Sequence, residues 1–184
     1  MQQRSSLWIS LMAVLGAACG GEIERAEPAS TAATAEAAAA ARVVLNLSWQ
    51  GQQRYYWCGP ASTRMALSTR MANPPSQDAL AAALGTTVNG TDHVGLVRTA
   101  LNRYLGTTWY ETKLMNDPPS KAQRDLLKRD ILLNLGNGYP LVANVVSGWR
   151  PPGYLGGTIY HYVTVVGYDQ GGDRVLIADP AGTC

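Results

Sequence analysis

The sequence predicts an α+β domain in which helices come first and antiparallel strands follow. Apolar residues recur at helical spacing between residues 60 and 135. Three later segments, at 140–146, 159–168 and 173–178, are instead rich in β-branched residues and bounded by turn residues. Helices segregated from an antiparallel sheet are typical of the α+β class. Composition agrees, because 46% of the 184 residues are hydrophobic and 15% are charged, which suits a packed core.

The first 18 residues have the features of an export signal. Arg4 precedes a short apolar run at residues 7–14, and small residues follow before Cys19. The run is shorter than the roughly 20 residues that a membrane-spanning helix needs. Two interpretations stay open: cleavage near residue 18 releases a soluble protein, or Cys19 is acylated as the first residue of a lipoprotein. In both cases we expect an exported protein, either secreted, periplasmic or anchored to the cell envelope through a lipid on Cys19.

The rest of the chain divides into a tether and one domain. Residues 19–41 are dominated by Ala, with Glu and Thr, and we interpret them as a tether or pro-segment. Residues 42–184 form the predicted domain, which begins with a strand at 43–47.

The predicted helices carry recognisable start signals. Pro60 suits the first turn of a helix, where its missing N–H costs nothing. Ser76, Asp92 and Ser120 are placed to cap the three helices that follow, and Gln123 completes a capping box with Ser120. A glycine stands near the predicted end of each of these three helices, as expected for a helix C-terminus.

Cys58 directly precedes a helix start, where free backbone N–H groups and the helix dipole favour a thiolate, the reactive form of cysteine. A disulfide between Cys58 and Cys184 is the alternative if Cys19 is lipidated or removed. A reactive thiol needs a base, and the chain has two histidines. His93 lies at the start of an amphipathic helix, where a structural role is expected. His161 lies in an apolar strand and needs polar partners, so we predict that it is the base.

Asp179 is the candidate that orients His161. If residues 169–172 form a hairpin loop, Tyr168 pairs with Asp173, and Asp179 falls one residue away from the position opposite His161. Side chains alternate between the two faces of a strand. A one-residue bulge or a different loop is therefore needed to bring both side chains onto one face.

These segments resemble the peptidase C39-like family of papain-like cysteine peptidases. The resemblance spans roughly residues 47–180. It is carried by the stretches QQRYYWCGPAS at 52–62, HYVTVVGYD at 161–169 and IADP at 177–180. It implies a papain-like fold, with a helical lobe followed by an antiparallel sheet lobe and a cleft between them. Domains of this family usually continue beyond the last of these stretches, so truncation of this domain at its C-terminus stays open.

The resemblance also implies a role for each of four residues. Cys58 matches the nucleophile, His161 the general base and Asp179 the residue that orients the imidazole. Gln52, six residues before the cysteine, matches the side chain that helps to form the oxyanion hole. An amide N–H there can stabilise a developing oxyanion alongside the backbone N–H of the nucleophile. Gln50 or Gln53 would replace it if the loop were shifted.

The expected activity is hydrolysis of peptide bonds through a thioester, in a monomer that acts on a peptide or protein substrate. No cofactor is expected, and no metal, because two histidines and one available cysteine give no ligand spacing. A net charge of +2 with scattered basic residues argues against nucleic acid as a partner. Two alternatives stay open: an acyltransferase that passes the thioester to an amine, and a non-catalytic surface binding module. Substrate specificity depends on loops such as residues 148–157, whose shape the sequence does not predict.

Overall fold

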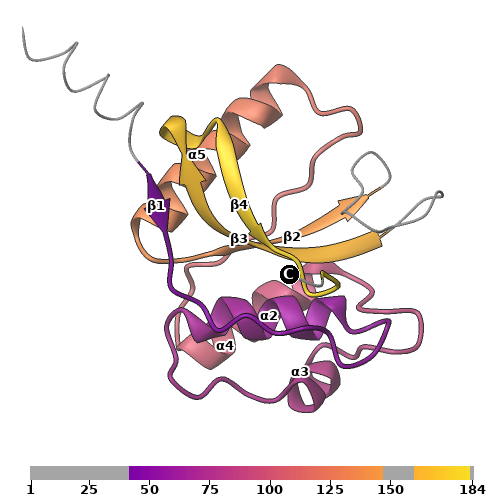
Figure 1. The fold of residues 1–184 in the computed structure, drawn as a ribbon. Coiled ribbons are helices and arrows are strands. Elements are labelled where there is room, and N and C mark those ends of the chain that lie inside the picture. Colours follow the sequence, from indigo (N-terminus) through magenta and orange to yellow (C-terminus); the bar gives the residue numbers. More distant parts are fainter. Residues whose placement is uncertain (1–41, 147–159, 183–184) are drawn as a thin grey trace, which may run out of the picture.

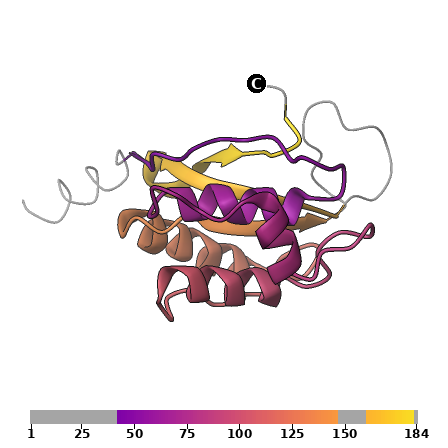
Figure 2. The same cartoon turned by 90° about the horizontal axis from the view of Figure 1, so that it is seen from below.

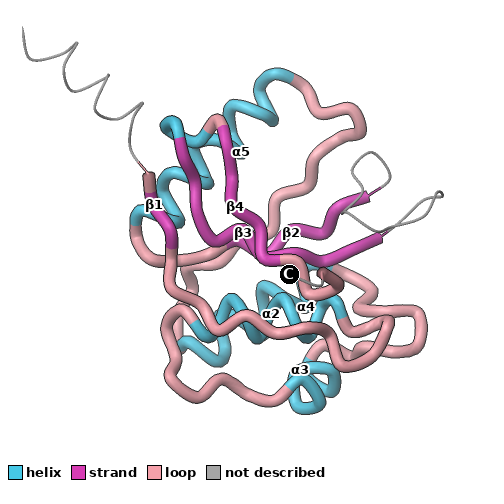
Figure 3. Tube along the Cα trace, in the orientation of Figure 1, coloured by secondary structure: helices cyan, strands magenta, loops and turns pink. Residues whose placement is uncertain are grey.

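The computed structural model describes residues 42–146 and 160–182 (Figure 1). The described helices are α2 (Cys58–Ser68), α3 (Gln77–Ala83), α4 (Val94–Leu105) and α5 (Lys121–Gly136). The strands are β1 (Val43–Val44), β2 (Leu141–Val146), β3 (Tyr160–Asp169) and β4 (Arg174–Ala178), with a short 3-10 helix, η1 (Gln170–Gly172), before β4. This order of helices and antiparallel strands confirms the predicted α+β class (Figure 3).

Several sequence predictions fall outside the described residues. These are the export signal at 1–18, the tether at 19–41 with Cys19, the loop at 148–157, and Cys184. Among the residues that the structure does describe, no helix is both long enough and apolar enough to cross a membrane.

Strand β3 is the centre of the sheet. β2 pairs with residues 160–165 of β3, β1 pairs with residues 167–168, and β4 pairs along 164–169, all antiparallel. Val165 has partners in both β2 and β4, and Tyr168 has partners in both β1 and β4. β4 therefore lies along one edge of β3, while β1 and β2 share the other edge.

Strand β1 is shorter than the predicted strand at 43–47. Only Val43 and Val44 pair with β3 as a regular strand, and the Leu45 N–H makes one further bond, to the Val166 carbonyl at 2.8 Å. Beyond Leu45 the chain leaves the sheet and leads towards α2 (Figure 1).

The helices divide into two groups around the sheet. α2, α3 and α4 lie together in the lower half of Figure 1, whereas α5 lies with the strands. The reason is that α5 buries Ile131 and Leu135 against Val165 and Tyr168 of β3. The prediction that all helices form one lobe and all strands the other is therefore wrong for α5, which packs on the sheet.

Two of the three predicted helix caps are confirmed. The Ser76 hydroxyl caps α3, and Ser120 and Gln123 form a capping box at the start of α5. The prediction that Asp92 caps α4 is wrong, because the helix begins one residue later. His93 is the N-cap, and its ring Nδ1 accepts a hydrogen bond from the backbone N–H two residues further on at 2.9 Å.

Candidate active site

Cys58 is the first residue of α2 and is 8% exposed, with a free thiol. The preceding residue, Trp57, occupies the N-cap position, and its side chain makes no capping hydrogen bond. The backbone N–H groups of the first helical turn therefore have no side-chain cap. They lie at the N-terminal end of the helix, where the helix dipole stabilises negative charge. Pro60, in the same turn, has no N–H to leave unpaired, as the sequence indicated.

Gly59 allows a close approach of another segment to this helix start. A Cβ atom at residue 59 would overlap Thr91 Oγ1 and lie 2.9 Å from Thr91 Cβ. Thr91 is buried and shares a hydrogen bond with the Thr86 hydroxyl at 2.7 Å. The residue after the candidate nucleophile is thus restricted to glycine by packing against the segment between α3 and α4.

His161 and Asp179 are in contact. The Nε2 atom of His161 lies 2.7 Å from Asp179 Oδ1, and the histidine is only 3% exposed. Asp179 Oδ1 also accepts a hydrogen bond from the Ala181 N–H at 2.8 Å, which fixes the direction of the carboxylate. Because Nε2 is bonded to Asp179, the hydrogen bond between His161 and Cys58 is assigned to Nδ1.

The hairpin register that produces this contact differs from the predicted one. Tyr168 pairs with Val175 and Asp169 pairs with Arg174, so the expected pairing of Tyr168 with Asp173 is wrong. The turn consists of η1 and the following Asp173 rather than residues 169–172.

A β-bulge in β3 then brings the two side chains onto one face. Between Gly167 and Val165 the register shifts, so that Val165 pairs with Ile177. Paired residues share a face of the sheet, as does every second residue along a strand. Asp179 therefore falls on the face of His161, which the register before the bulge would not allow. The sequence analysis left open a one-residue bulge or a different loop, and the structure has a bulge.

The pKa of His161 reports its surroundings. Burial of the ring is the largest influence and lowers the pKa, but the hydrogen bonds to Cys58 and Asp179 and their negative charges together raise it above 6.5. His161 thus interacts with both Cys58 and Asp179. A buried imidazole held between a thiol and a carboxylate is poised to accept a proton from the thiol.

Two buried hydrogen bonds fix α2 against β3. The Ser62 hydroxyl donates to the Tyr162 carbonyl at 2.9 Å, and the Thr164 hydroxyl donates to the Ser62 carbonyl at 2.9 Å. Both hydroxyl-bearing residues are fully buried. Ser62 lies one helical turn after Cys58, and Tyr162 directly follows His161, so these bonds set the position of the thiol along the strand that carries its partner.

Ser62 and Thr164 are site-positioning residues that the sequence analysis missed. The signal available was weak: Ser62 is four residues after Cys58 on the inward face of the helix, and Thr164 interrupts an apolar strand. Polar side chains at inward positions need partners, but a sequence does not say which ones.

Gln52 lies in the connection between β1 and α2. Its side-chain Nε2 donates to the carbonyls of Tyr55 at 2.7 Å and Arg54 at 3.1 Å, while its Oε1 is buried without a hydrogen-bond partner. Of the flanking alternatives, Gln53 is exposed. Gln50 is partly buried, and its Nε2 has no hydrogen-bond partner in the described part of the chain.

The same connection holds the turn that carries the carboxylate. The Gln52 N–H donates to the Pro180 carbonyl at 2.8 Å, and the Trp49 indole N–H donates to the Asp179 carbonyl at 3.1 Å. Figure 2 shows this connection running close to the end of the chain that follows β4. Segments from opposite ends of the domain, carrying Gln52 and Asp179, are therefore joined backbone to backbone.

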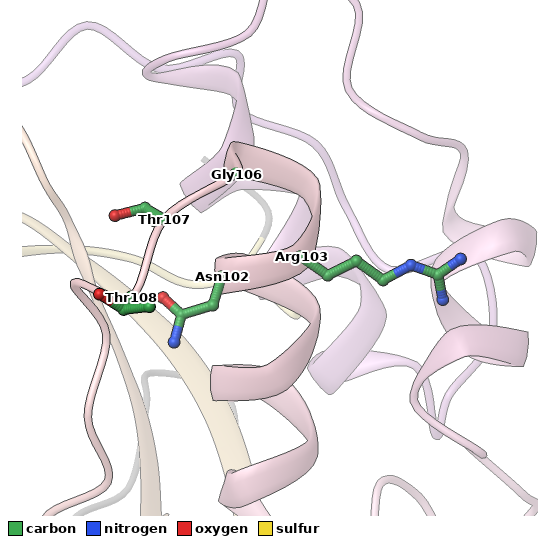
Figure 4. Close-up of a pocket in the computed structure, with 5 residues that line it drawn as sticks. All are labelled: Asn102, Arg103, Gly106, Thr107 and Thr108. Atoms are coloured by element: carbon green, nitrogen blue, oxygen red, sulfur yellow. The ribbon is translucent and has the colours of Figure 1, made fainter.

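A shallow hollow lies elsewhere, at the C-terminal end of α4 (Figure 4). It is lined by Asn102, Arg103, Gly106, Thr107 and Thr108. The Asn102 amide is already engaged, since it both donates to and accepts from the Tyr110 backbone at 2.9 Å, and the Arg103 side chain points away from it. Across residues 42–146 and 160–182, no group of three His, Cys, Asp or Glu side chains is arranged to hold a metal ion.

A comparison of the sequence with protein-family models identifies its family. The model of the Peptidase_C39 like family matches residues 44–183. The match covers well over half of the sequence, and the chain belongs to the Peptidase_C39-like family. Membership of this family suggests a cysteine peptidase-like function. No curated protein and no solved structure gave a significant match.

Proposed function

We propose that this protein is a cysteine peptidase with a papain-like active site, in which Cys58 is the nucleophile, His161 the general base and Asp179 the residue that orients the imidazole. The contact of 2.7 Å between His161 and Asp179, in a histidine that also interacts with Cys58, is the observation that carries the proposal. Three residues from separate parts of the sequence meet at a helix start. The base lies between the nucleophile and the carboxylate, as nucleophilic catalysis requires.

The proposed reaction has two steps. His161 takes the thiol proton, the Cys58 sulfur bonds to the carbonyl carbon of an amide, and the C–N bond breaks as His161 returns the proton to the leaving amine. Water then attacks the thioester carbon, with His161 as base, and releases a carboxylic acid and the free thiol. Asp179 holds the imidazole in the required tautomer and stabilises the imidazolium formed in each step.

The developing oxyanion needs hydrogen-bond donors. The Cys58 backbone N–H at the uncapped start of α2 is one, and the Gln52 amide is proposed as the other. In the present arrangement both Gln52 N–H groups face carbonyls, and the contact to Arg54 is the longer at 3.1 Å. An anion is a stronger acceptor than a neutral carbonyl, so this N–H is the one that turns to the oxyanion when substrate binds.

The proposal also covers the compartment in which the enzyme works. The apolar run at residues 7–14 and the small residues before Cys19 support export, with residues 19–41 as a tether or pro-segment. We propose that the enzyme works outside the cytoplasm, as a monomer, on peptide or protein substrates. Attachment to a membrane would be through a lipid on Cys19.

Mapping of thiol reactivity and hydrolysis in the same samples tests the proposal. Cys58 should be the preferred site of iodoacetamide alkylation at neutral pH, read by mass spectrometry, and labelled casein should be hydrolysed. Cys58→Ala should abolish hydrolysis, and His161→Ala should lower kcat/KM by roughly 10²- to 10⁴-fold. His93→Ala is the matched control, because it removes the other histidine, which only caps α4.

Three results would contradict the proposal: hydrolysis that survives Cys58→Ala, a Cys58–Cys184 disulfide in active material, or no preference of iodoacetamide for Cys58. Capture of most of the acyl group by an added amine, in place of water, would assign acyl transfer as the reaction. Comparison of Gln52→Ala with Gln50→Ala decides which glutamine is the oxyanion donor, since loss of the true donor should lower kcat more.

A further inference from the structure

Gln77 is a buried polar residue that the proposed chemistry does not use. It is the first residue of α3 and is 2% exposed. Glutamine is rarely buried so completely, because its amide has to find partners for two donors and an acceptor. Within residues 42–146 and 160–182, every hydrogen bond of its side chain goes to one short stretch of chain, residues 50–53.

The three contacts surround Gln52. Gln77 Nε2 donates to the Gly51 carbonyl at 2.9 Å, and Gln77 Oε1 accepts from the Gln53 N–H at 3.0 Å. That carbonyl and that N–H belong to the two peptide groups on either side of the Gln52 Cα atom. The second Gln77 N–H donates to Gln50 Oε1 at 2.9 Å. One side chain therefore holds both peptide planes that determine where the Gln52 side chain starts.

A further backbone group of this stretch, the Gln52 N–H, is held from the other direction. The Gln52 N–H donates to the Pro180 carbonyl at 2.8 Å, next to Asp179. The backbone at Gln77 is also fixed, since the Ser76 hydroxyl caps α3 at the preceding residue. Gln52 is thus held between a capped helix on one side and the carboxylate turn on the other.

We propose that Gln77 is a positioning residue for the oxyanion donor: it fixes the backbone of Gln52 so that the amide reaches the oxyanion. The inference rests on the proposed function of Gln52. It predicts that loss of the Gln77 amide slows attack on a carbonyl, where an oxyanion develops, and leaves reactions of the thiol without an oxyanion unchanged.

Two reactions of the same thiol separate these effects. Acylation of Cys58 by p-nitrophenyl acetate passes through an oxyanion, and alkylation by iodoacetamide does not. In Gln77→Met, which keeps length but not hydrogen bonding, the acylation rate should fall roughly 10- to 100-fold, with the alkylation rate unchanged. Gln77→Glu keeps an acceptor for the Gln53 N–H but sets a carboxylate oxygen against the Gly51 carbonyl and Gln50 Oε1, so its loss in the same reaction should be at least as large. It also serves as the second variant if Gln77→Met fails to fold.

A double-mutant cycle tests whether Gln77 acts through Gln52. In a Gln52→Ala background, Gln77→Met should have no further effect on acylation. Ser120→Ala is the matched control, because it removes the same kind of helix cap from α5 and leaves the cap of α3 in place, and it should acylate at the wild-type rate.

The inference is overturned if Gln77→Met acylates normally, if acylation and alkylation fall together, or if its effect persists undiminished without Gln52. Acylation that survives Cys58→Ala would instead overturn the proposed function itself. The two failures are therefore distinguishable in one set of samples.

Discussion

At the scale of single residues, His161 is subject to opposing influences. Burial disfavours the imidazolium, whereas the hydrogen bonds and negative charges of Cys58 and Asp179 favour it and prevail. The charge on His161 therefore depends on two partners that come from different elements. A change in either partner should be visible in the pH dependence of the site.

Asp179→Asn should move the alkaline limit of activity to lower pH. The Asp179 carboxylate raises the pKa of His161, so its replacement by a neutral amide lowers that pKa, and the imidazolium is lost at a lower pH. We also expect kcat/KM to fall roughly 10²-fold or more, because the ring loses its orienting acceptor. The profile of kcat/KM against pH measures both effects, and the profile of Cys58 alkylation against pH follows the thiolate.

Asp125→Asn is the control for this substitution, since Asp125 is an exposed residue paired with Lys121 on α5. It should leave both profiles unchanged. An alkaline limit that stays in place in Asp179→Asn would show that the carboxylate does not set the protonation of His161.

At the scale of elements, the start of α2 depends on a glycine. Gly59→Ala places a methyl group against Thr91, and the first turn of the helix or the Thr91 segment has to move. We expect the free energy of unfolding to fall by about 1–3 kcal/mol, as for other overpacked sites, together with slower alkylation of the neighbouring Cys58. Urea denaturation and alkylation kinetics measure the two effects.

Gly136→Ala makes the same chemical change at the end of α5, where an added methyl group meets nothing within 4 Å. It should leave stability unchanged or raise it by up to about 1 kcal/mol. Equal destabilisation by the two substitutions would mean that the close approach to Thr91 is unimportant.

The helix caps show which structural features could be predicted from the sequence. Caps by Ser76 and Ser120 were predictable because they depend on residues a few positions apart. The cap of α4 was misassigned because Asp92 and His93 both carry a suitable acceptor, and only the backbone angles decide between them. The general order of helices and strands followed from periodicity alone.

The candidate site was predictable only in part. Its residue types and their order pointed to Cys58, His161 and Asp179, but the contact between the last two depends on a bulge near Val166. That bulge lies in a run of buried residues that does not alternate between apolar and polar, so no pattern reveals it. Gln77 was invisible for a related reason: a glutamine at a helix start looks solvent-exposed until the tertiary fold covers it.

At the scale of the whole molecule, the helical group and the sheet meet along α2 and β3. Besides apolar contacts, the buried hydroxyls of Ser62 and Thr164 join the two across this interface. A buried hydroxyl that loses its partner, or a carbonyl that loses its donor, costs more than the hydrogen bond itself contributes. The interface is therefore apolar, and its two hydrogen bonds also fix the position of α2 along β3.

Thr164→Val should lower the free energy of unfolding by about 1–3 kcal/mol, because the Ser62 carbonyl loses a buried donor with almost no change in side-chain shape. Thr99→Val is the matched control, since the Thr99 hydroxyl also donates to a backbone carbonyl, at 2.9 Å, but on an exposed face of α4. It should change stability by no more than about 0.5 kcal/mol. Urea denaturation of both variants gives the comparison, and similar losses would contradict a special role for the interface.

The central place of β3 has a consequence in time. A nascent chain emerges from its N-terminus, so the helix with Cys58 leaves the ribosome about a hundred residues ahead of the strand with His161. Until β3 arrives, the described strands have no partner, and closing so long a loop is among the slower events of folding. Until then the thiol of Cys58 lacks its contact with His161. The proposed active site is therefore completed late in folding, when β3 packs against the helix that carries Cys58.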